Sequence, residues 1–367
     1  MVSLFGIRPP SSPYVHQPLI YTVLASPVQT ILYIVHNVLQ SLRAPPTPVK
    51  PPVRVVCISD THTLTHASIP DGDLLIHAGD LTNNGTPSEL HAQLTWLSSL
   101  PHPHKVVIAG NHDTQLDPRS RATLSEPDRS APLPDWSSFG IHYLQHSPLT
   151  LDIHPSPHHS PAEETPPSRK SSTTSTDIPD SPTSPSPHRR HHHRRRRLHL
   201  HGSPQIPTCG PSSFAFQHPR ALDAWTDTLP TDLDILITHT PPAQHLDNFP
   251  AALGDAWLLR EVWRVRPRLH VCGHVHVGAG REVLWWDGAQ GAYERGLGRR
   301  AWWWTGRGLW DVRLWREVVR VLVWGVVGVV WSRVWGGEER GTVLVNAALM
   351  DEATGRLREG GVHVVDI

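Results

Sequence analysis

The stretches VRVVCISDTH (residues 53–62), DLLIHAGD (73–80) and KVVIAGNHD (105–113) share one pattern. Each begins with a run of valine, isoleucine or leucine and ends on a polar turn. Short continuous apolar runs are typical of strands that are buried on both faces of a parallel sheet. The chain is therefore predicted to contain three such strands in its first third.

Between the second and third runs lies PSELHAQLTWLSSL (87–100), whose apolar residues follow a helical period. Leu90, Leu94 and Leu97 fall on one helical face, and Pro87 stands where helices often begin. Alternation of strand, helix and strand predicts an α/β sheet. Further strands are predicted at 141–144, 149–153, 198–202, 234–238, 269–273, 342–347 and 362–367, and helices at 219–229 and 251–266.

The composition excludes some classes of protein. The 367 residues contain 33 basic and 33 acidic side chains, so the chain is neither basic nor acidic throughout. Three cysteines are too few for a disulfide framework, which favours a reducing compartment and a cytoplasmic location. Cys57 and Cys272 lie inside apolar runs, and we expect them to be buried core thiols.

Residues 154–197 interrupt the pattern of strands and helices. They are almost all Pro, Ser, Thr, His and Arg, and they end in HRRHHHRRRR (188–197). No packed core can be built from this composition, so we predict a disordered loop inserted between two strands. The basic tract suits nucleic acid, anionic lipid or an import receptor as a partner, although a solvated linker is the simpler interpretation and a nucleic acid is not favoured.

The N-terminal segment, residues 1–52, contains only three charged side chains. Residues 19–39 are mostly apolar and long enough to span a bilayer, but Pro27 interrupts them. The run also lacks the basic start and small-residue cleavage site of a secretory signal. Two interpretations stay open: a membrane-associated helix, and an amphipathic helix that docks on the domain and precedes the stiff linker APPTPVKPP (44–52).

Most of the chain's 15 tryptophans lie in a second unusual segment, residues 285–340. Within it, VLVWGVVGVVW (321–331) carries no charge and stands between Arg320 and Arg333. This run is short for a full membrane span, so it predicts a buried or interfacial helix. Together with the N-terminal helix it could form a membrane-facing or partner-facing patch. The other interpretation is an insertion that packs on itself and on the domain.

Polar side chains follow five of the predicted strands. The turns are Asp60-Thr61-His62, Gly79-Asp80, Gly110-Asn111-His112-Asp113, Thr238-His239-Thr240 and Gly273-His274-Val275-His276. The carboxyl ends of parallel strands meet in one crevice, which is where α/β sheets bind ligands. Among the side chains of these turns, two carboxylates, four imidazoles and one amide would converge there, a mixed set of nitrogen and oxygen donors that suits first-row transition metals. The set is too rich for one ion, and two ions that share a carboxylate would account for it.

In these motifs, D-T-H, G-D, G-N-H-D, H and G-H-V-H, the chain resembles the calcineurin-like metallophosphoesterase superfamily. The longer strings SDTHT, GDLTNNG, VIAGNHD, ITHTPP and VNAA resemble its subgroup of metallophosphoesterase-domain-containing proteins. The resemblance covers roughly 53–153, 198–284 and 341–367. It implies a four-layer α/β/β/α sandwich of two mixed sheets with helices outside. A single domain at 53–367 would then contain the disordered insertion 154–197 and the Trp-rich insertion 285–340.

The resemblance also implies the role of each site residue. Asp60, His62 and His276 would hold one divalent transition metal (Mn, Fe, Zn or Ni). Asn111, His239 and His274 would hold a second, and Asp80 would bridge the two. A hydroxide between the metals would attack phosphorus, and His112 would act as the general acid that protonates the leaving group.

The chain departs from the family pattern at one position. The protein-phosphatase branch carries an aspartate three residues after the bridging aspartate, and here that residue is Asn83. A Ser/Thr protein phosphatase is therefore disfavoured. Asn83 and Asp113 are both candidates for orienting His112. His77 lies in the predicted strand that leads to Asp80, and we expect it to be a core histidine.

The predicted function is a binuclear-metal phosphoesterase, with small phosphodiesters or cyclic nucleotides as the leading substrates. The alternatives are a phosphomonoesterase or nuclease of the same superfamily, and a membrane-tethered scaffold that has lost turnover. Membrane association would run through 19–39 and 321–331. The sequence does not indicate an oligomeric state.

Overall fold

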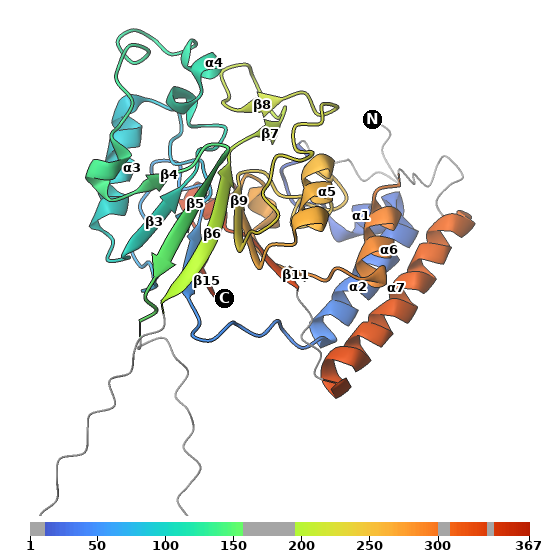
Figure 1. Cartoon of the computed structure of the whole chain (residues 1–367). Helices are drawn as coiled ribbons and strands as arrows, with labels where there is room; N and C mark the ends of the chain where they lie inside the picture. The colour runs from blue at the N-terminus through green and yellow to red at the C-terminus, as the bar shows by residue number, and fades with distance from the viewer. Residues whose placement is uncertain (1–11, 157–194, 300–308, 336–340) are drawn as a thin grey trace, which may run out of the picture.

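The structure is a computed structural model, and it describes residues 12–156, 195–299, 309–335 and 341–367. The predictions that fall on residues 157–194, the greater part of the low-complexity insertion, lie outside the described residues. Two mixed β-sheets and a group of long helices make up the described part (Figure 1).

The first sheet contains the three strands that begin the pattern described above. Its order is β15-β1-β2-β3-β4, with β15 antiparallel to β1 and the other neighbours parallel. The strands are β1 Arg54–Ile58, β2 Leu74–His77, β3 His104–Val107, β4 His142–Tyr143 and β15 His363–Asp366. Helix α3, Pro87–Ser99, connects β2 to β3 as predicted, and Thr86 and Glu89 cap its first turn reciprocally.

The second sheet has the order β11-β12-β10-β9-β6-β5. Its four central strands are parallel, and the edge strands β11 and β5 run antiparallel to their neighbours. The strands are β5 Ser147–Ile153, β6 Arg196–Ser203, β9 Ile235–Thr238, β10 Leu269–Cys272, β11 Gly280–Leu284 and β12 Thr342–Asn346. Strand β11 is not among the strands predicted from the sequence.

The two sheets face each other across the main core. Val55 and Ile76 of the first sheet belong to the same buried cluster as Ile237 and Val271 of the second. The outer face of the first sheet packs on α3, and the outer face of the second packs on α5, Ala256–Val265. The layers therefore run helix, sheet, sheet, helix, and the predicted four-layer α/β/β/α sandwich is confirmed. Cys57 and Cys272 are buried core thiols, as expected.

Several predictions differ from the structure, and the helix predicted at 251–266 begins only at Ala256. Residues 219–229 form turns and no helix, because the Asp223 side chain accepts bonds from the backbone N–H groups of Trp225 and Thr226, which competes with a helix. Strand β6 begins at Arg196, so residues 196–197 pair with β5 and are not part of a disordered loop. Shorter elements are η1 Thr114–Leu116, α4 Pro118–Arg121, η2 Trp136–Phe139, β7 Ile206–Pro207, β8 Gln217–His218, η4 His276–Gly278, β13 Met350–Asp351 and β14 Arg356–Leu357.

The N-terminal segment and the Trp-rich segment form one helical unit beside the second sheet (Figure 1). It consists of α1 Leu19–Ala25, α2 Pro27–Leu42, α6 Gly288–Leu297 and α7 Val312–Val330. Buried apolar side chains of α2, α6 and α7, among them Leu32, Tyr293 and Val321, make a core of their own. The amphipathic N-terminal helix docked on the domain is thus the interpretation that the structure supports.

Helix α7 is longer than the predicted segment 321–331. It begins at Val312 because Asp311 accepts bonds from the N–H groups of Arg313 and Leu314, and a π-helical turn, Trp331–Trp335, continues it. Among the described residues, Val312–Trp335 is a helix long and apolar enough to cross a membrane by length and composition alone. The core helix of a soluble protein can pass the same test, so this is weak support for a membrane span.

A buried histidine ties this helical unit to the second sheet. His245 has no exposed side-chain surface, and its Nδ1 and Nε2 lie 3.0 Å from Glu282 and 3.2 Å from Glu294. Burial alone would lower the pKa of His245, but the two carboxylates raise it to about 10. The imidazole is therefore a buried cation that joins β11 to α6.

Replacing His245 with alanine is expected to lower the free energy of unfolding by about 3 kcal/mol, because two carboxylates lose their shared cation. Urea unfolding of the whole chain measures this loss. His245 gains protons on folding, so its contribution is complete below pH 6.5 and disappears as pH rises through about 10. The matched control is His199→Ala, since His199 pairs with the exposed Asp232 and should matter by less than about 1 kcal/mol. An equal loss at pH 6 and pH 10 would contradict the cationic state of His245.

Candidate metal centre

The predicted site residues lie in the turns that follow β1, β2 and β3 of one sheet and β9 and β10 of the other. Four of them, Asp60, His62, Asp80 and His274, have positive φ angles of 46–66°. Non-glycine residues rarely adopt this left-handed conformation, and it costs on the order of 1 kcal/mol each. Such strain is concentrated at functional sites, where the surrounding structure holds the side chains in a required direction.

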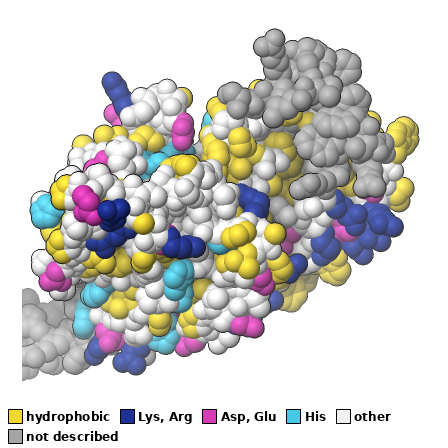
Figure 2. All heavy atoms as spheres, turned by 90° about the horizontal axis from the view of Figure 1, so that it is seen from above, with side chains coloured by type: hydrophobic (Ala, Val, Ile, Leu, Met, Phe, Trp, Pro, Cys, Tyr) yellow, Lys and Arg dark blue, Asp and Glu magenta, His cyan; other side chains and the backbone are white. Residues whose placement is uncertain are grey.

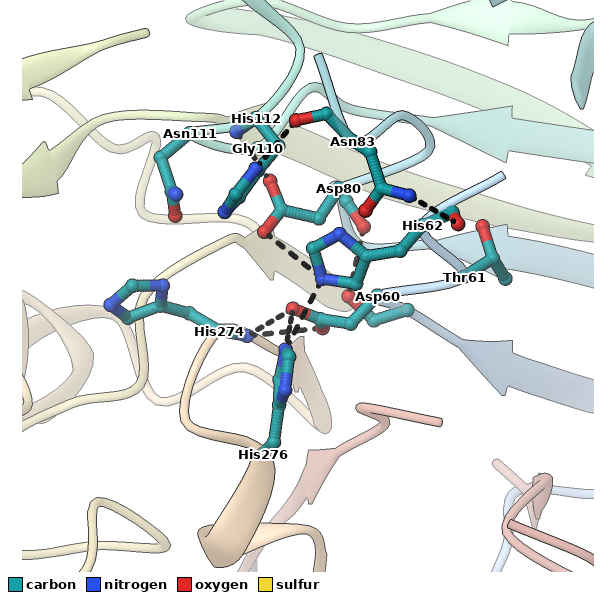
Figure 3. A network of polar contacts seen from close by, with 12 residues as sticks. Asp60, Thr61, His62, Asp80, Asn83, Gly110, Asn111, His112, His274 and His276 are labelled. Atoms are coloured by element: carbon teal, nitrogen blue, oxygen red, sulfur yellow. Dashed lines mark hydrogen bonds and ion pairs between the residues drawn. The ribbon is translucent and has the colours of Figure 1, made fainter. Parts of the chain in front are cut away.

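One group of side chains consists of Asp60, His62 and His276, whose ligand atoms all lie within 4.8 Å of one another. The Nε2 atoms of His62 and His276 are 3.4 Å apart, and His276 Nε2 is 3.1 Å from Asp60 Oδ1. Figure 3 shows the rings of His62 and His276 turned toward each other and toward the two carboxylates. Asp60 is fully buried, and the backbone N–H of His274 donates to it.

The other group consists of Asp80, His239 and His274, again within 4.8 Å. Asn111 lies beside it, with Oδ1 3.1 Å from His239 Nε2. Asp80 lies between the groups, because its Oδ2 is 3.4 Å from His239 Nε2 and 3.7 Å from His62 Nε2. The structure thus brings together every ligand that the sequence predicted, and it places Asp80 at the junction.

Hydrogen bonds outside these groups leave ring nitrogens free to bind a cation. His239 Nδ1 is 2.9 Å from the carbonyl oxygen of Ala78, which can only accept, so the proton of a neutral ring is on Nδ1. The lone pair of Nε2 then faces the oxygens of Asp80 and Asn111. Histidines that bind metals usually donate their second nitrogen to a carbonyl or carboxylate in this way. The donor set therefore fits a bound cation.

The ring of His276 has a carboxylate beside each of its nitrogens. Its Nδ1 lies 3.0 Å from the carboxylate of Glu352, and its Nε2 faces Asp60. Burial alone would lower the pKa of His276, but the bonds to Asp60 and Glu352 raise it to about 10. In the same way, Asp80 and its hydrogen bond overcome burial and raise the pKa of His239 to about 9. The carboxylates thus create a strong demand for positive charge, which a proton or a metal ion can meet.

His112 is only partly buried, and its ring lies 4.9 Å from that of His62, measured between centroids. Its Nδ1 donates to the backbone carbonyl of Asn83 at 2.8 Å, so Nε2 is the nitrogen that remains for chemistry. The backbone of Asn83 thus orients His112, and the Asn83 side chain donates instead to the carbonyl oxygen of His62. His112 also has a ligand atom within 4.8 Å of those of His62 and Asp80, so geometry alone permits a ligand role as well.

The Asp113 carboxylate bonds to groups other than the His112 ring, and it joins two of the turns. Its carboxylate accepts bonds from the N–H groups of Gly110 and Thr82 and from the Thr82 hydroxyl. Burial raises the pKa of Asp113 to about 6 in spite of these bonds. His77 is likewise structural: it is buried, and its Nε2 is 3.0 Å from the hydroxyl oxygen of Thr61.

Three residues near the site were not singled out from the sequence. Glu352 comes from the β13–β14 hairpin near the C-terminus. Phe214 lies 4.6 Å from the ring of His112, and Tyr14 meets the ring of His274 edge-on at 5.7 Å, between centroids. The side-chain amide of Asn248 holds the Tyr14 segment by donating to the carbonyl groups on either side of Tyr14. All three come from irregular segments, where no periodicity or strand end marks a functional residue.

Comparison with known proteins agrees with this geometry. The family model "Calcineurin-like phosphoesterase" matches residues 53–278, more than half of the chain, and the match includes all the residues that form the two groups. The chain belongs to the calcineurin-like phosphoesterase family. The resemblance seen in its motifs is thereby confirmed, and this family classes the chain with the hydrolases of phosphoric esters.

Relatives of this phosphoesterase differ widely in length. Metallophosphoesterase domain-containing protein 1 of Homo sapiens is 35% identical over 63% of this chain and 63% of its own length. The UPF0046 protein K07C11.7 of Caenorhabditis elegans is 32% identical over 65% of this chain and 69% of its own length. The "Probable rhamnogalacturonate lyase C" of Emericella nidulans is 37% identical over 81% of this chain. This chain spans only 23% of that protein, so the lyase name describes a much longer molecule.

Two glycines of the phosphoesterase motifs leave room for the carboxylates. A Cβ atom on Gly273 would overlap Asp60 and the Ser59 hydroxyl, and one on Gly110 would overlap Asp80 and His239. Side chains at these positions must displace a ligand because the backbone lies against it. The G-N-H-D and G-H-V-H motifs therefore specify space as well as candidate ligands.

Gly273→Ala is expected to lower turnover at least about a hundredfold, because a shift of roughly 1 Å in a positioned group can cost that much. Metal analysis should show a lower metal content for the purified variant. Gly280→Ala is the matched control, since a Cβ atom there would meet its neighbours only at ordinary distances of 3.8 Å or more. Equal metal content and turnover in the two variants would show that Asp60 can move aside without loss.

Proposed function

We propose that this phosphoesterase is a two-metal phosphodiesterase that hydrolyses small phosphodiesters, cyclic nucleotides among them. The observation that carries the proposal is the pair of ligand groups that meet at Asp80, with His112 beside them. Two-metal hydrolysis of phosphate esters needs two adjacent cation sites, a carboxylate between them and a proton donor for the leaving oxygen.

In this proposal, Asp60, His62 and His276 hold one ion and Asn111, His239 and His274 hold the other. Asp80 serves both. Imidazole, carboxylate and amide donors without a thiolate suit Mn, Fe, Ni or Zn, and we take manganese as the first ion to test. When bound, the two cations lower the pKa of a water molecule to give a nucleophile at neutral pH and neutralise charge on the phosphoryl oxygens.

His112 supplies the proton in this proposal. The carbonyl of Asn83 fixes Nδ1, so Nε2 can carry a proton toward the leaving oxygen. Because Nδ1 donates to a backbone group, the ring keeps its direction whatever side chain stands at position 83. This arrangement supports an active phosphoesterase in spite of the missing aspartate of the protein-phosphatase branch.

The two aromatic side chains support a substrate with a planar group. Phe214 stands beside His112, where the leaving group must lie to receive a proton, and Tyr14 stands beside His274 of the second ligand group. A nucleobase or an aryl ring can pack against such side chains at offset or edge-on geometry. Small cyclic nucleotides and aryl diesters therefore suit the site better than long alkyl diesters.

The proposal is tested with the purified full-length chain, manganese and four substrates. These are bis-p-nitrophenyl phosphate, p-nitrophenyl phosphate, cyclic AMP and a short single-stranded oligodeoxynucleotide. We expect manganese-dependent hydrolysis of the diester and of cyclic AMP, faster than that of the monoester. The Asp80→Asn variant is the blank for each substrate.

The outcomes separate the proposal from its alternatives. Faster hydrolysis of the monoester would replace the phosphodiesterase with a phosphomonoesterase, and cleavage of the oligonucleotide alone would replace it with a nuclease. If the unmodified chain turns over no faster than the Asp80→Asn blank with manganese, iron, nickel or zinc, the alternative of a catalytically silent scaffold would be supported.

A further inference from the structure

Helices α2 and α7 present an apolar face that no described residue covers. On α7, six aliphatic side chains are 41–57% exposed: Val319, Leu322, Val323, Val326, Val327 and Val330. On α2, a stripe of four is 37–54% exposed: Ile31, Ile34, Val38 and Leu42. A surface helix of a soluble protein turns such residues toward its core, so an outward apolar face marks an interaction site.

The inward side of α7 is already filled by other residues. Gly325 lies against Leu39 of α2 and Gly328 lies against Arg43, the residue that follows α2, so a Cβ atom at either glycine would overlap its neighbour. Glu317 is almost fully buried, and an ion pair 3.1 Å long joins it to Arg295 of α6. Gly325, Gly328 and Glu317 already pack α7 on its neighbours. The aliphatic side chains on the other faces of α7 are therefore not needed for that packing.

The apolar stripes of the two helices form one continuous face. At 3.6 residues per turn, Leu322 and Val326 of α7 lie on the flank nearest α2. The stripe of α2 from Ile31 to Leu42 lies on the flank nearest α7, because its other flank carries Gln29 against α6. Side-by-side packing of α2 and α7 therefore joins the two stripes.

Arginines border this face. The solvent-facing charged side chains on α2 and on α7 through Trp335 are Arg313, Arg316, Arg320 and Arg333. The one acidic side chain in these helices, Glu317, is buried beneath Arg316 and Arg320. Lys and Arg side chains gather beside hydrophobic ones at the right of Figure 2. The face therefore combines aliphatic surface with net positive charge.

We propose that the α2/α7 face docks on the surface of an anionic lipid bilayer, with both helices lying in the plane of the interface. The aliphatic side chains enter the boundary between headgroups and acyl chains, and the arginines meet lipid phosphates. The exposed indoles of Trp324, Trp331 and Trp335 suit the headgroup level, where tryptophan is enriched. A protein partner of matching shape would not by itself require this border of arginines and tryptophans.

Docking on the surface fits the helices better than crossing the bilayer. The charge-free part of α7 and the π-helical turn that continues it runs from Val321 to Ser332, because Arg320 and Arg333 bound it. At 1.5 Å per residue this part is roughly 18 Å long, whereas the hydrocarbon core is about 30 Å thick. The arginines before Val321 would have to be buried in hydrocarbon if α7 crossed completely.

The test is flotation of the full-length chain with vesicles of phosphatidylcholine alone and with vesicles that also contain phosphatidylserine. We expect binding to the anionic vesicles, at least about tenfold weaker binding to the neutral ones, and a loss of binding at high salt. Lipids brominated on the acyl chain should quench part of the tryptophan emission of the unmodified chain, which requires no variant.

Three variants locate the surface. Val323→Asp with Val327→Asp should weaken binding to anionic vesicles at least tenfold, because two charges enter the apolar face. Leu222→Asp is the matched control, since Leu222 is 52% exposed but lies outside the helical unit. Arg313→Gln with Arg316→Gln should remove the preference for anionic vesicles. Thermal melting of each variant verifies that the fold persists.

No flotation with either vesicle and no quenching by brominated lipid would overturn the proposal. Concentration-dependent dimers that the Val323→Asp, Val327→Asp variant separates would overturn it in favour of contact between two copies. Equal weakening by Leu222→Asp would show that binding does not use this face. None of these results depends on phosphoesterase activity.

Discussion

Asp80→Asn is expected to reduce turnover to background and to lower metal content from two ions per chain to one or fewer. The side chain keeps its shape but loses the charge that the two ligand groups share. Asp80 Oδ2 is 3.4 Å from His239 and 3.7 Å from His62, so one change affects both groups. Without the negative charge between them, two cations at about 4 Å repel each other strongly. Elemental analysis and hydrolysis of bis-p-nitrophenyl phosphate measure the two effects.

His77→Gln is the control for Asp80→Asn. His77 ends strand β2, which leads into the turn that carries Asp80, and it is buried like Asp80. Its ring nitrogens bond to the Thr61 hydroxyl and to the backbone N–H of Gly79. This variant should keep its metals and most of its turnover. Asp80→Asn protein with two metals and normal turnover would refute the bridging role.

The meeting of these polar side chains could be predicted because each follows a strand directly, whereas their roles as ligands come from the family resemblance. An apolar run that ends in a polar turn is a local pattern, and parallel strands bring their carboxyl ends together whatever the connections between them. Asp60, Asp80 and His239 therefore meet although 20 residues separate Asp60 from Asp80 and more than 150 separate Asp80 from His239. Glu352 and Tyr14 follow no such pattern, and only the tertiary fold brings them to the site.

Two errors in the helices have physical causes that the sequence also contains. Residues 219–229 have helical spacing, but Asp223 bonds to the backbone ahead of it and holds a turn. Asp311 would have marked the start of α7 as an N-cap, whereas the charge-free run alone suggested a start near residue 321. The exposure of α7 was not predictable, because a helix that is apolar on most faces has the same pattern whether it is buried or exposed.

The helical unit depends on contacts that cross the predicted boundary at residue 52. Gln29 of α2 donates to backbone carbonyls at the end of α6, and Arg43 pairs with Asp287. These polar contacts are specific in direction, unlike apolar packing alone. They explain why the N-terminal segment and the Trp-rich segment occupy one place in the fold, although more than 240 residues separate them.

His112→Asn is expected to lower kcat by roughly 10²–10⁴ while metal content stays at two, because it removes a proton donor and no ligand. His112 has a ligand atom close to those of His62 and Asp80, so metal analysis is the measurement that decides between the two roles. A fall in metal content together with kcat would assign His112 to the ligand set and refute its role as an acid.

The leaving group gives a second, independent readout for His112. An acid matters most when the departing oxygen is strongly basic, so His112→Asn should reduce hydrolysis of cyclic AMP, which releases an alkoxide, more than hydrolysis of a nitrophenyl diester. Asn83→Ala is the matched control. The group that orients His112 is the backbone carbonyl of residue 83, which alanine retains, so kcat should fall by less than tenfold. A large loss in Asn83→Ala would mean instead that the Asn83 side chain, which donates to the carbonyl oxygen of His62, holds the site in place.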